Sequence, residues 1–190
     1  MQEQKLYQKY SNGKHWEQHP TIYAKSFVEF LKKHKFEGSI VDIGCGNGRD
    51  VNVFTKFGFN ALGIDNSEKE IKSNKKNYPK LKFEVQDTEN LKLKNDSVDA
   101  FFMVNVIHYV NKEKAIQEVF RVLKPQGYFF IHFNIEIVDK DGKIDYFYDQ
   151  KDILNLIPNF KILQVNVFER VDNHPVEHKH KIMELILQKP

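Results

Sequence analysis

Short apolar runs alternate with helix-like repeats along most of the chain. The run Ser39–Ile43 is apolar apart from one acid, which indicates a strand buried on both faces. The segment that follows it carries Val51, Phe54 and Phe57 at helical spacing. This alternation is typical of βα units stacked around a parallel sheet. The strands predicted in this series are Ser39–Ile43, Ala61–Ile64, Lys82–Gln86, Val98–Val104 and Tyr128–Phe133.

Local signals place helices between these strands. Ser67 and Glu70 form a capping-box pattern, so a helix is expected to start there and to run to about Tyr78. The other helices are expected after Pro20, after Gly48, over Lys112–Leu123 and over Gln150–Ile157.

The last part of the chain has strands with no helix between them. An Asp141-Gly142 pair predicts a hairpin within residues 135–148. The strands Ile162–Phe168 and Ile182–Leu187 are joined by a predicted loop, Asp172–Lys181. A connection this short cannot make a parallel crossover, so the final strand must run antiparallel to its neighbour. The pattern therefore predicts an α/β domain whose sheet is mostly parallel.

Composition narrows the classes of partner and compartment. The 29 Lys+Arg and 26 Asp+Glu leave a net charge of +3, too small to indicate a nucleic acid or a membrane surface as partner. Residues 1–10 lack an apolar signal segment, and no apolar run approaches the ~18 residues of a membrane span, so we expect a cytoplasmic protein. Cys45 is the only cysteine, which excludes zinc sites with two or more cysteines.

The strongest local motif is a glycine-rich loop directly after the first strand. Asp42 precedes it, and Gly44, Gly46 and Gly48 alternate within it, before a helix. Glycines at these positions let the backbone pass close beneath a ligand and present its amides. The spacing differs from the G-x-G-x-x-G of dinucleotide dehydrogenases, which disfavours a nicotinamide-dependent oxidoreductase. A carboxylate at Asp42 would repel a pyrophosphate but suits a ligand with an ammonium group.

Acidic residues also end the next two strands. Asp65 ends the second strand, 21 residues after Gly44, where a carboxylate can accept hydrogen bonds from both hydroxyls of a ribose. Asp87, with Thr88 beside it, ends the third strand, where it can accept a bond from an adenine amino group.

These motifs together resemble the class I S-adenosylmethionine-dependent methyltransferases, of the compact type that methylates small molecules. The resemblance covers residues 38–133 and rests on motifs in the family's order and spacing, including Arg121-Val122-Leu123-Lys124-Pro125-Gln126-Gly127. It implies a Rossmann-like, doubly wound sheet of seven strands, mostly parallel with an antiparallel last strand. It also implies a single domain over 1–190: a cap segment and helix at 1–37, a cofactor-binding core at 38–133, and a substrate-side insertion with a terminal hairpin at 134–190.

The resemblance implies S-adenosyl-L-methionine as the cofactor and assigns positions to its parts. The loop and Asp42 would hold the methionine part, Asp65 the ribose, and Asp87 with Thr88 the adenine, while Asn105 would lie near the reacting methyl. The full set of expected cofactor residues is Tyr10, Trp16, Asp42, Gly44, Cys45, Gly46, Gly48, Asp65, Asn66, Asp87, Thr88 and Asn105.

Histidines gather near the predicted carboxyl edge of the sheet. His108 follows the fourth strand, and His174, His178 and His180 fall in the predicted loop between the last two strands. Three imidazoles can hold zinc, but the loop lacks the i, i+4 frame of a helical metal motif, so we expect no metal. We favour the hypothesis that these histidines form a polar wall for the substrate or supply a general base, with the candidate bases His178, His180 and His108. The alternative is that they are ordinary loop histidines without a role in the reaction.

The expected activity is transfer of a methyl group to a small molecule by in-line displacement. At 190 residues the fold has almost no room for an appended substrate domain, which favours a small acceptor over a macromolecule. A non-catalytic sensor or activating subunit that binds the same cofactor is the alternative from another class. The sequence is silent on oligomeric state.

Overall fold

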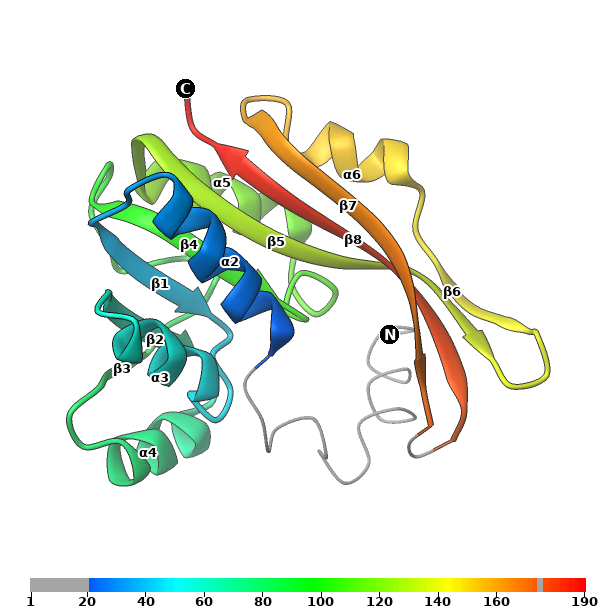
Figure 1. Ribbon diagram of the computed structural model, residues 1–190, viewed down its shortest axis with the longest axis horizontal. Helices are drawn as coiled ribbons and strands as arrows, with labels where there is room; N and C mark the ends of the chain where they lie inside the picture. The colour runs from blue at the N-terminus through cyan, green and yellow to red at the C-terminus, as the bar shows by residue number, and fades with distance from the viewer. Residues whose placement is uncertain (1–20, 174–175) are drawn as a thin grey trace.

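A computed structural model of the chain describes residues 21–173 and 176–190 (Figure 1). The described helices are α2 (Ile22–Lys33), α3 (Arg49–Lys56), α4 (Glu68–Asn77), α5 (Lys112–Val122) and α6 (Gln150–Leu156). The strands are β1 (Ser39–Ile43), β2 (Asn60–Asp65), β3 (Lys82–Val85), β4 (Val98–Val104), β5 (Leu123–Asp139), β6 (Ile144–Phe147), β7 (Lys161–Asp172) and β8 (His178–Gln188).

One sheet organises the domain, with the strand order β3-β2-β1-β4-β5-β8-β7. The pairs from β3 to β5 are all parallel, whereas β8 runs antiparallel to both of its neighbours. This confirms the predicted α/β fold with an antiparallel last strand. The strand β6 pairs only with the end of β5 and makes the sheet eight-stranded, because the predicted Asp-Gly hairpin extends β5 rather than forming a separate unit.

The C-terminal strands are longer than the sequence predicted. The strand β7 continues to Asp172 and β8 already begins at His178, so the expected loop Asp172–Lys181 is wrong at both ends. In β8 the histidines at 178 and 180 are buried while Lys179 and Lys181 are half-buried, which continues the strand alternation. Charged and imidazole side chains made this strand segment look like a loop.

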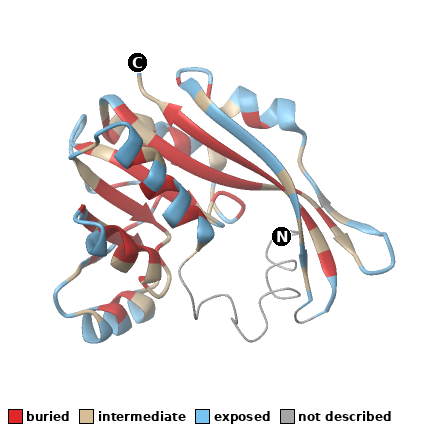
Figure 2. Cartoon of the chain, viewed as in Figure 1, coloured by how far each residue is buried: buried red, intermediate tan, exposed pale blue. Residues whose placement is uncertain are grey.

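Helices cover both faces of the sheet and define two apolar layers. The helices α2, α3 and α4 pack on one face, where Phe27 and Phe54 meet Phe102 and Phe130 of the strands. The helices α5 and α6 cover the opposite face, which the strands line with residues such as Phe101. The buried inner strands contrast with the exposed edge strand β7 (Figure 2). Among the described helices, none is long and apolar enough to cross a bilayer.

Capping side chains set where the helices begin. Ser67 Oγ accepts a hydrogen bond from the Glu70 amide at 3.3 Å, which confirms the predicted helix start at Ser67. Thr21 and Asn111 cap α2 and α5 in the same way. Because Ser67 follows the last residue of β2 by only two positions, its cap fixes the direction in which the chain leaves the sheet edge.

The aromatic cluster around Phe102 gives a test of the core. Its ring lies 5.1 Å from those of both Phe54 and Phe130, and the side chain is 1% exposed. We expect Phe102→Ala to lower the free energy of unfolding by about 3–5 kcal/mol, because it removes these contacts and leaves a cavity. Phe147→Ala, at a side chain that is 65% exposed, is the matched control and should cost well under ~1 kcal/mol. Urea denaturation measures both, and equal costs would contradict this account of the core.

Candidate functional site

A cavity of about 710 Å³ opens beyond the carboxyl ends of β1, β2 and β4. This is the edge at which open α/β sheets bind ligands, and the volume lies within the ~300–1,000 Å³ of small-molecule pockets. Of the residues predicted for a cofactor, eight line it: Asp42, Gly44, Cys45, Gly46, Asp65, Asn66, Thr88 and Asn105.

The glycine loop after β1 depends on three left-handed residues. Gly44, Gly46 and Gly48 have φ values of +66°, +50° and +75°. A side chain at Gly44 would collide with Val106, and one at Gly48 would meet the ring of Phe83. At Gly46 a Cβ would meet nothing within 4 Å, so this peptide faces the open cavity. Gly48 supports the loop from behind and is not part of the cavity wall.

The half-buried backbone of Gly46 is held from both sides. Its N–H donates to Asp65 Oδ2 at 3.0 Å, and its carbonyl accepts from Asn74 Nδ2 at 2.6 Å. Asn74 is fully buried on α4, and Asp65 Oδ1 also accepts from the Ser67 amide at 2.9 Å. The loop is therefore fixed by side chains from the end of β2 and from α4.

Two buried carboxylates lie under the loop. Burial raises the pKa of Asp42 well above its ordinary value, and the nearby carboxylate of Asp50 raises it further, while Arg49 acts in the opposite sense. Burial also raises the pKa of Asp50, against the hydrogen bonds that Thr21 donates and the charge of Arg49. Burial thus disfavours the charged form of both carboxyls, and a cationic group in the cavity would favour their ionisation.

Asp50 and Thr21 join α2 to the glycine loop. The Thr21 amide and hydroxyl donate to the two carboxylate oxygens of Asp50 at 2.8 and 3.1 Å. Sequence reasoning missed both residues as part of the cavity wall, although Asp50 directly follows the glycine motif. The position of Asp50 in the first turn of α3, right behind the glycine loop, is the sequence feature that could have identified it.

The other residues predicted to bind the cofactor differ in whether they line the cavity. Asn105 has a φ of +59° at the end of β4 and lines the cavity. Asp87 is exposed, accepts a hydrogen bond from the Glu89 amide at 2.9 Å, and is not among the lining residues, whereas its neighbour Thr88 is. Tyr10 and Trp16 lie outside the described residues.

The candidate catalytic histidines do not line this cavity within the described chain. His108 is buried, and its Nε2 accepts a hydrogen bond from the Asn134 amide at 2.9 Å. Burial, together with Lys112 and His180, lowers the pKa of His108 to about 3, so it stays neutral near pH 7. His178 and His180 are buried side chains of β8. Sequence reasoning missed two groups of lining residues. One is polar or charged: Thr21, Asn47, Arg49, Asp50, Ser67 and Glu70. The other is apolar or aromatic: Phe102, Val104, Val106, Tyr109 and Val110.

Comparisons with known proteins show which family the residues around this cavity resemble. Residues 41–131 match the family model described as "Methyltransferase domain". The match spans the glycine loop, both strand-end acids and the strands that frame the cavity. These residues form a class I, S-adenosylmethionine-dependent methyltransferase domain.

Related sequences agree with this family. A Saccharomyces cerevisiae protein named as a probable S-adenosylmethionine-dependent methyltransferase is 33% identical over 138 residues, 66% of this chain and 47% of that protein. An uncharacterized protein of Methanocaldococcus jannaschii is 31% identical over 137 residues, 72% of this chain and 62% of its own length. The chain thus spans less than two thirds of the length of these relatives.

Solved structures share the fold of this chain. A SAM-dependent methyltransferase from Methanosarcina mazei superposes with a TM-score of 0.68 at 21% identity, covering 80% of this chain and 92% of that one. A Pyrococcus horikoshii protein gives a TM-score of 0.67 at 17% identity and covers 98% and 99% of the two chains. The C-terminal strands therefore also have counterparts in a fold of this type.

The buried Asp42 predicts a pH-dependent stability difference. Its folded-state pKa is raised, so its unfavourable contribution is absent below the pKa of the unfolded chain and grows as the pH rises toward the folded value. We expect Asp42→Asn to stabilise the ligand-free protein by about 1–3 kcal/mol at pH 8 and to make no difference near pH 3. Urea denaturation across this pH range is the measurement. Asp141→Asn at the exposed hairpin tip should change nothing, and a destabilised Asp42→Asn at pH 8 would contradict the assignment.

Proposed function

We propose that the chain transfers a methyl group from S-adenosyl-L-methionine to a small-molecule acceptor. The observation that carries the proposal is the Gly46 peptide, held open to the cavity by Asp65 and Asn74. When bound, the cofactor supplies a sulfonium methyl that is already activated toward a nucleophile. Catalysis then rests on orienting the acceptor in line with that methyl.

The polar residues of the cavity fit the parts of this cofactor. Asp42 and the Gly44–Gly46 backbone would receive the cationic end of the methionine moiety, whose ammonium offsets the buried negative charge. Asp65 would accept the ribose hydroxyls, because a carboxylate has about four acceptor positions and two serve backbone amides here. Thr88 lies in the wall toward β3, on the side proposed for the adenine, and Asp87 is proposed at its rim.

The apolar part of the wall favours a small acceptor. Phe102, Val104, Tyr109 and Val110 line the same cavity as the proposed cofactor residues. Side chains of this kind enclose a small organic molecule and exclude water from the reacting centre. The buried His108 already accepts a backbone hydrogen bond, so this histidine contributes position rather than a base near neutral pH. A catalytic role for His178 and His180 stays a prediction.

Two other functions remain as proposals of lower rank. A cofactor-binding sensor or activating subunit would use the same glycine loop without turnover. A macromolecular acceptor is the other, and the small net charge of +3 gives no support to a nucleic acid. The apolar wall favours the small-molecule proposal over both.

Binding measurements test the cofactor assignment. Calorimetry should show S-adenosylmethionine and its demethylated product binding to the wild type, with NAD unable to compete. Asp65→Ala should weaken binding by at least about 10–150-fold, because the loss of even one of its charge-assisted hydrogen bonds costs roughly 1.5–3 kcal/mol. Asp141→Ala at the exposed hairpin tip is the matched control and should bind as the wild type does. Tight NAD binding, or unchanged affinity in Asp65→Ala, would refute the assignment.

Turnover distinguishes the enzyme from the sensor. A panel of small amines, thiols and phenols is incubated with the protein and the cofactor, and release of the demethylated product is followed by mass spectrometry. We expect at least one small acceptor to be methylated, and Gly46→Val to abolish this because its side chain would enter the cavity. Tight cofactor binding with no product from small molecules, but with methylation of a protein or nucleic acid fraction, would shift the function to the macromolecular class.

A further inference from the structure

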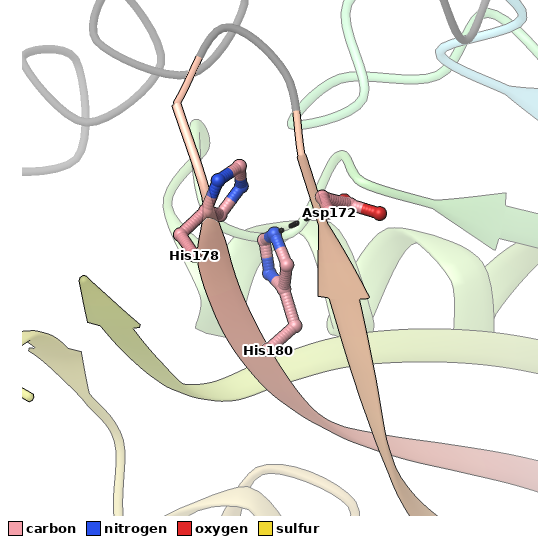
Figure 3. Close-up of side chains that lie close together, drawn as sticks. All are labelled: Asp172, His178 and His180. Carbon is pink, nitrogen blue, oxygen red and sulfur yellow. Dashed lines mark ion pairs between the residues drawn. The ribbon is translucent and has the colours of Figure 1, made fainter. Parts of the chain in front are cut away.

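Asp172, His178 and His180 form a second polar cluster, outside the cavity wall. Asp172 ends β7, and the two histidines begin β8 (Figure 3). A potential ligand atom from each of the three side chains lies within 4.8 Å of the others. Both histidines are buried, at 3% and 7% exposure, and among the described residues this is the one such group of three.

Strand register explains why the three side chains meet. Asp172 stands directly opposite His178 in the antiparallel β7–β8 pair, and His180 follows two positions later on the same strand. Residues opposite each other and residues two apart share one face of a sheet. The cluster is therefore built on paired strands, whose backbone hydrogen bonds hold its members in place.

Hydrogen bonds orient both histidine rings. Nδ1 of His178 lies 2.7 Å from the carbonyl oxygen of Val176, which can only accept, so this Nδ1 is the donor and Nε2 of His178 bears the lone pair. The ring of His180 spans two oxygens, with Nδ1 3.1 Å from Oδ1 of Asn134 and Nε2 3.4 Å from Oδ2 of Asp172, so a cation would replace the proton between Nε2 and the carboxylate. Histidines that ligate metals are oriented in this way, with the second nitrogen donating to a carbonyl or carboxylate.

We propose that Asp172, His178 and His180 bind a divalent transition-metal ion of the zinc class. Imidazole nitrogens and a carboxylate oxygen are the donors that zinc prefers, and three protein ligands leave one position for water or another molecule. Bonds of about 2.0–2.2 Å place tetrahedral ligand atoms roughly 3.4 Å apart, so ligand atoms that now lie within 4.8 Å of one another need to approach by at most about 1.4 Å.

Arg170 is the charged group that opposes the ion. Its guanidinium donates to Asp172 Oδ2 at 2.7 Å and to the Tyr23 hydroxyl at 2.8 Å. His180 Nε2 lies 3.4 Å from the same Oδ2. The described contacts of this carboxylate thus all use Oδ2, and Oδ1 is the oxygen that the ion would take.

The proposed ion is connected to the cofactor cavity through Asn134. Its side chain receives the His180 hydrogen bond, and its backbone N–H donates to His108 Nε2 at 2.9 Å. His108 directly precedes Tyr109, which lines the cavity. An ion at the strand ends would therefore stiffen the segment on which one wall of the cavity depends.

Metal titration of chelator-stripped protein tests this inference without reference to methyl transfer. Calorimetry with Zn²⁺ should show saturable binding of a single ion per chain, and Co²⁺ should give the visible absorption bands of a coordinated ion. His178→Ala, His180→Ala and the isosteric Asp172→Asn should each weaken binding by at least about 100-fold, and Asn134→Ala by about 10–100-fold through loss of orientation. His34→Ala, at an exposed histidine, should bind as the wild type does.

Circular dichroism of each variant separates a lost ligand from a lost fold. If an alanine variant unfolds, the proposal is tested by Asp172→Asn, which keeps a side chain of the same size on the strand face. The cobalt spectrum of the wild type tests it as well, because that measurement needs no substitution. Absence of saturable binding to the wild type overturns the proposal. So does binding that survives in folded His178→Ala, His180→Ala and Asp172→Asn, since the ion then lies elsewhere.

Discussion

The hydrogen bonds that hold the Gly46 peptide are the interaction on which the proposed function depends. Gly46 lies in a left-handed conformation at the open edge of the sheet, with no neighbour within 4 Å of its missing side chain. Such a peptide would be free to turn without the bonds from Asp65 and Asn74. With them, its backbone is set in advance for a ligand, which lowers the conformational entropy that binding must overcome.

The same edge buries two carboxyl groups, and their ionisation there costs stability. Asp42 and Asp50 are buried close to each other, and the pKa of each is raised by burial. A fold selected for stability alone would place neutral groups there. Their presence is explained by a ligand that brings a positive charge, so the destabilised ligand-free state and the affinity for a cationic cofactor have one physical origin.

Most of the fold and much of the cavity could be predicted from periodicity and glycine spacing. The helix start at Ser67 and the antiparallel last strand follow from local rules, and both are confirmed. Asn74 could not be found in this way, because it lies in a lysine-rich helix whose pattern predicts a solvated face. Its burial results from the packing of α4 against the glycine loop, which is a tertiary contact. The cluster of Asp172 with His178 was equally hidden, since only strand register brings residues of an apparent loop opposite each other.

A crystal structure with the demethylated cofactor product bound tests the central claim most directly. The account predicts density in the cavity beside Gly46, with the ribose hydroxyls within hydrogen-bond distance of Asp65 and the ammonium group facing Asp42. The Gly46 peptide should keep the orientation that Asn74 gives it. A product bound away from the glycine loop, for example in the groove between α5 and α6 lined by Phe120 and Tyr148, would contradict the account.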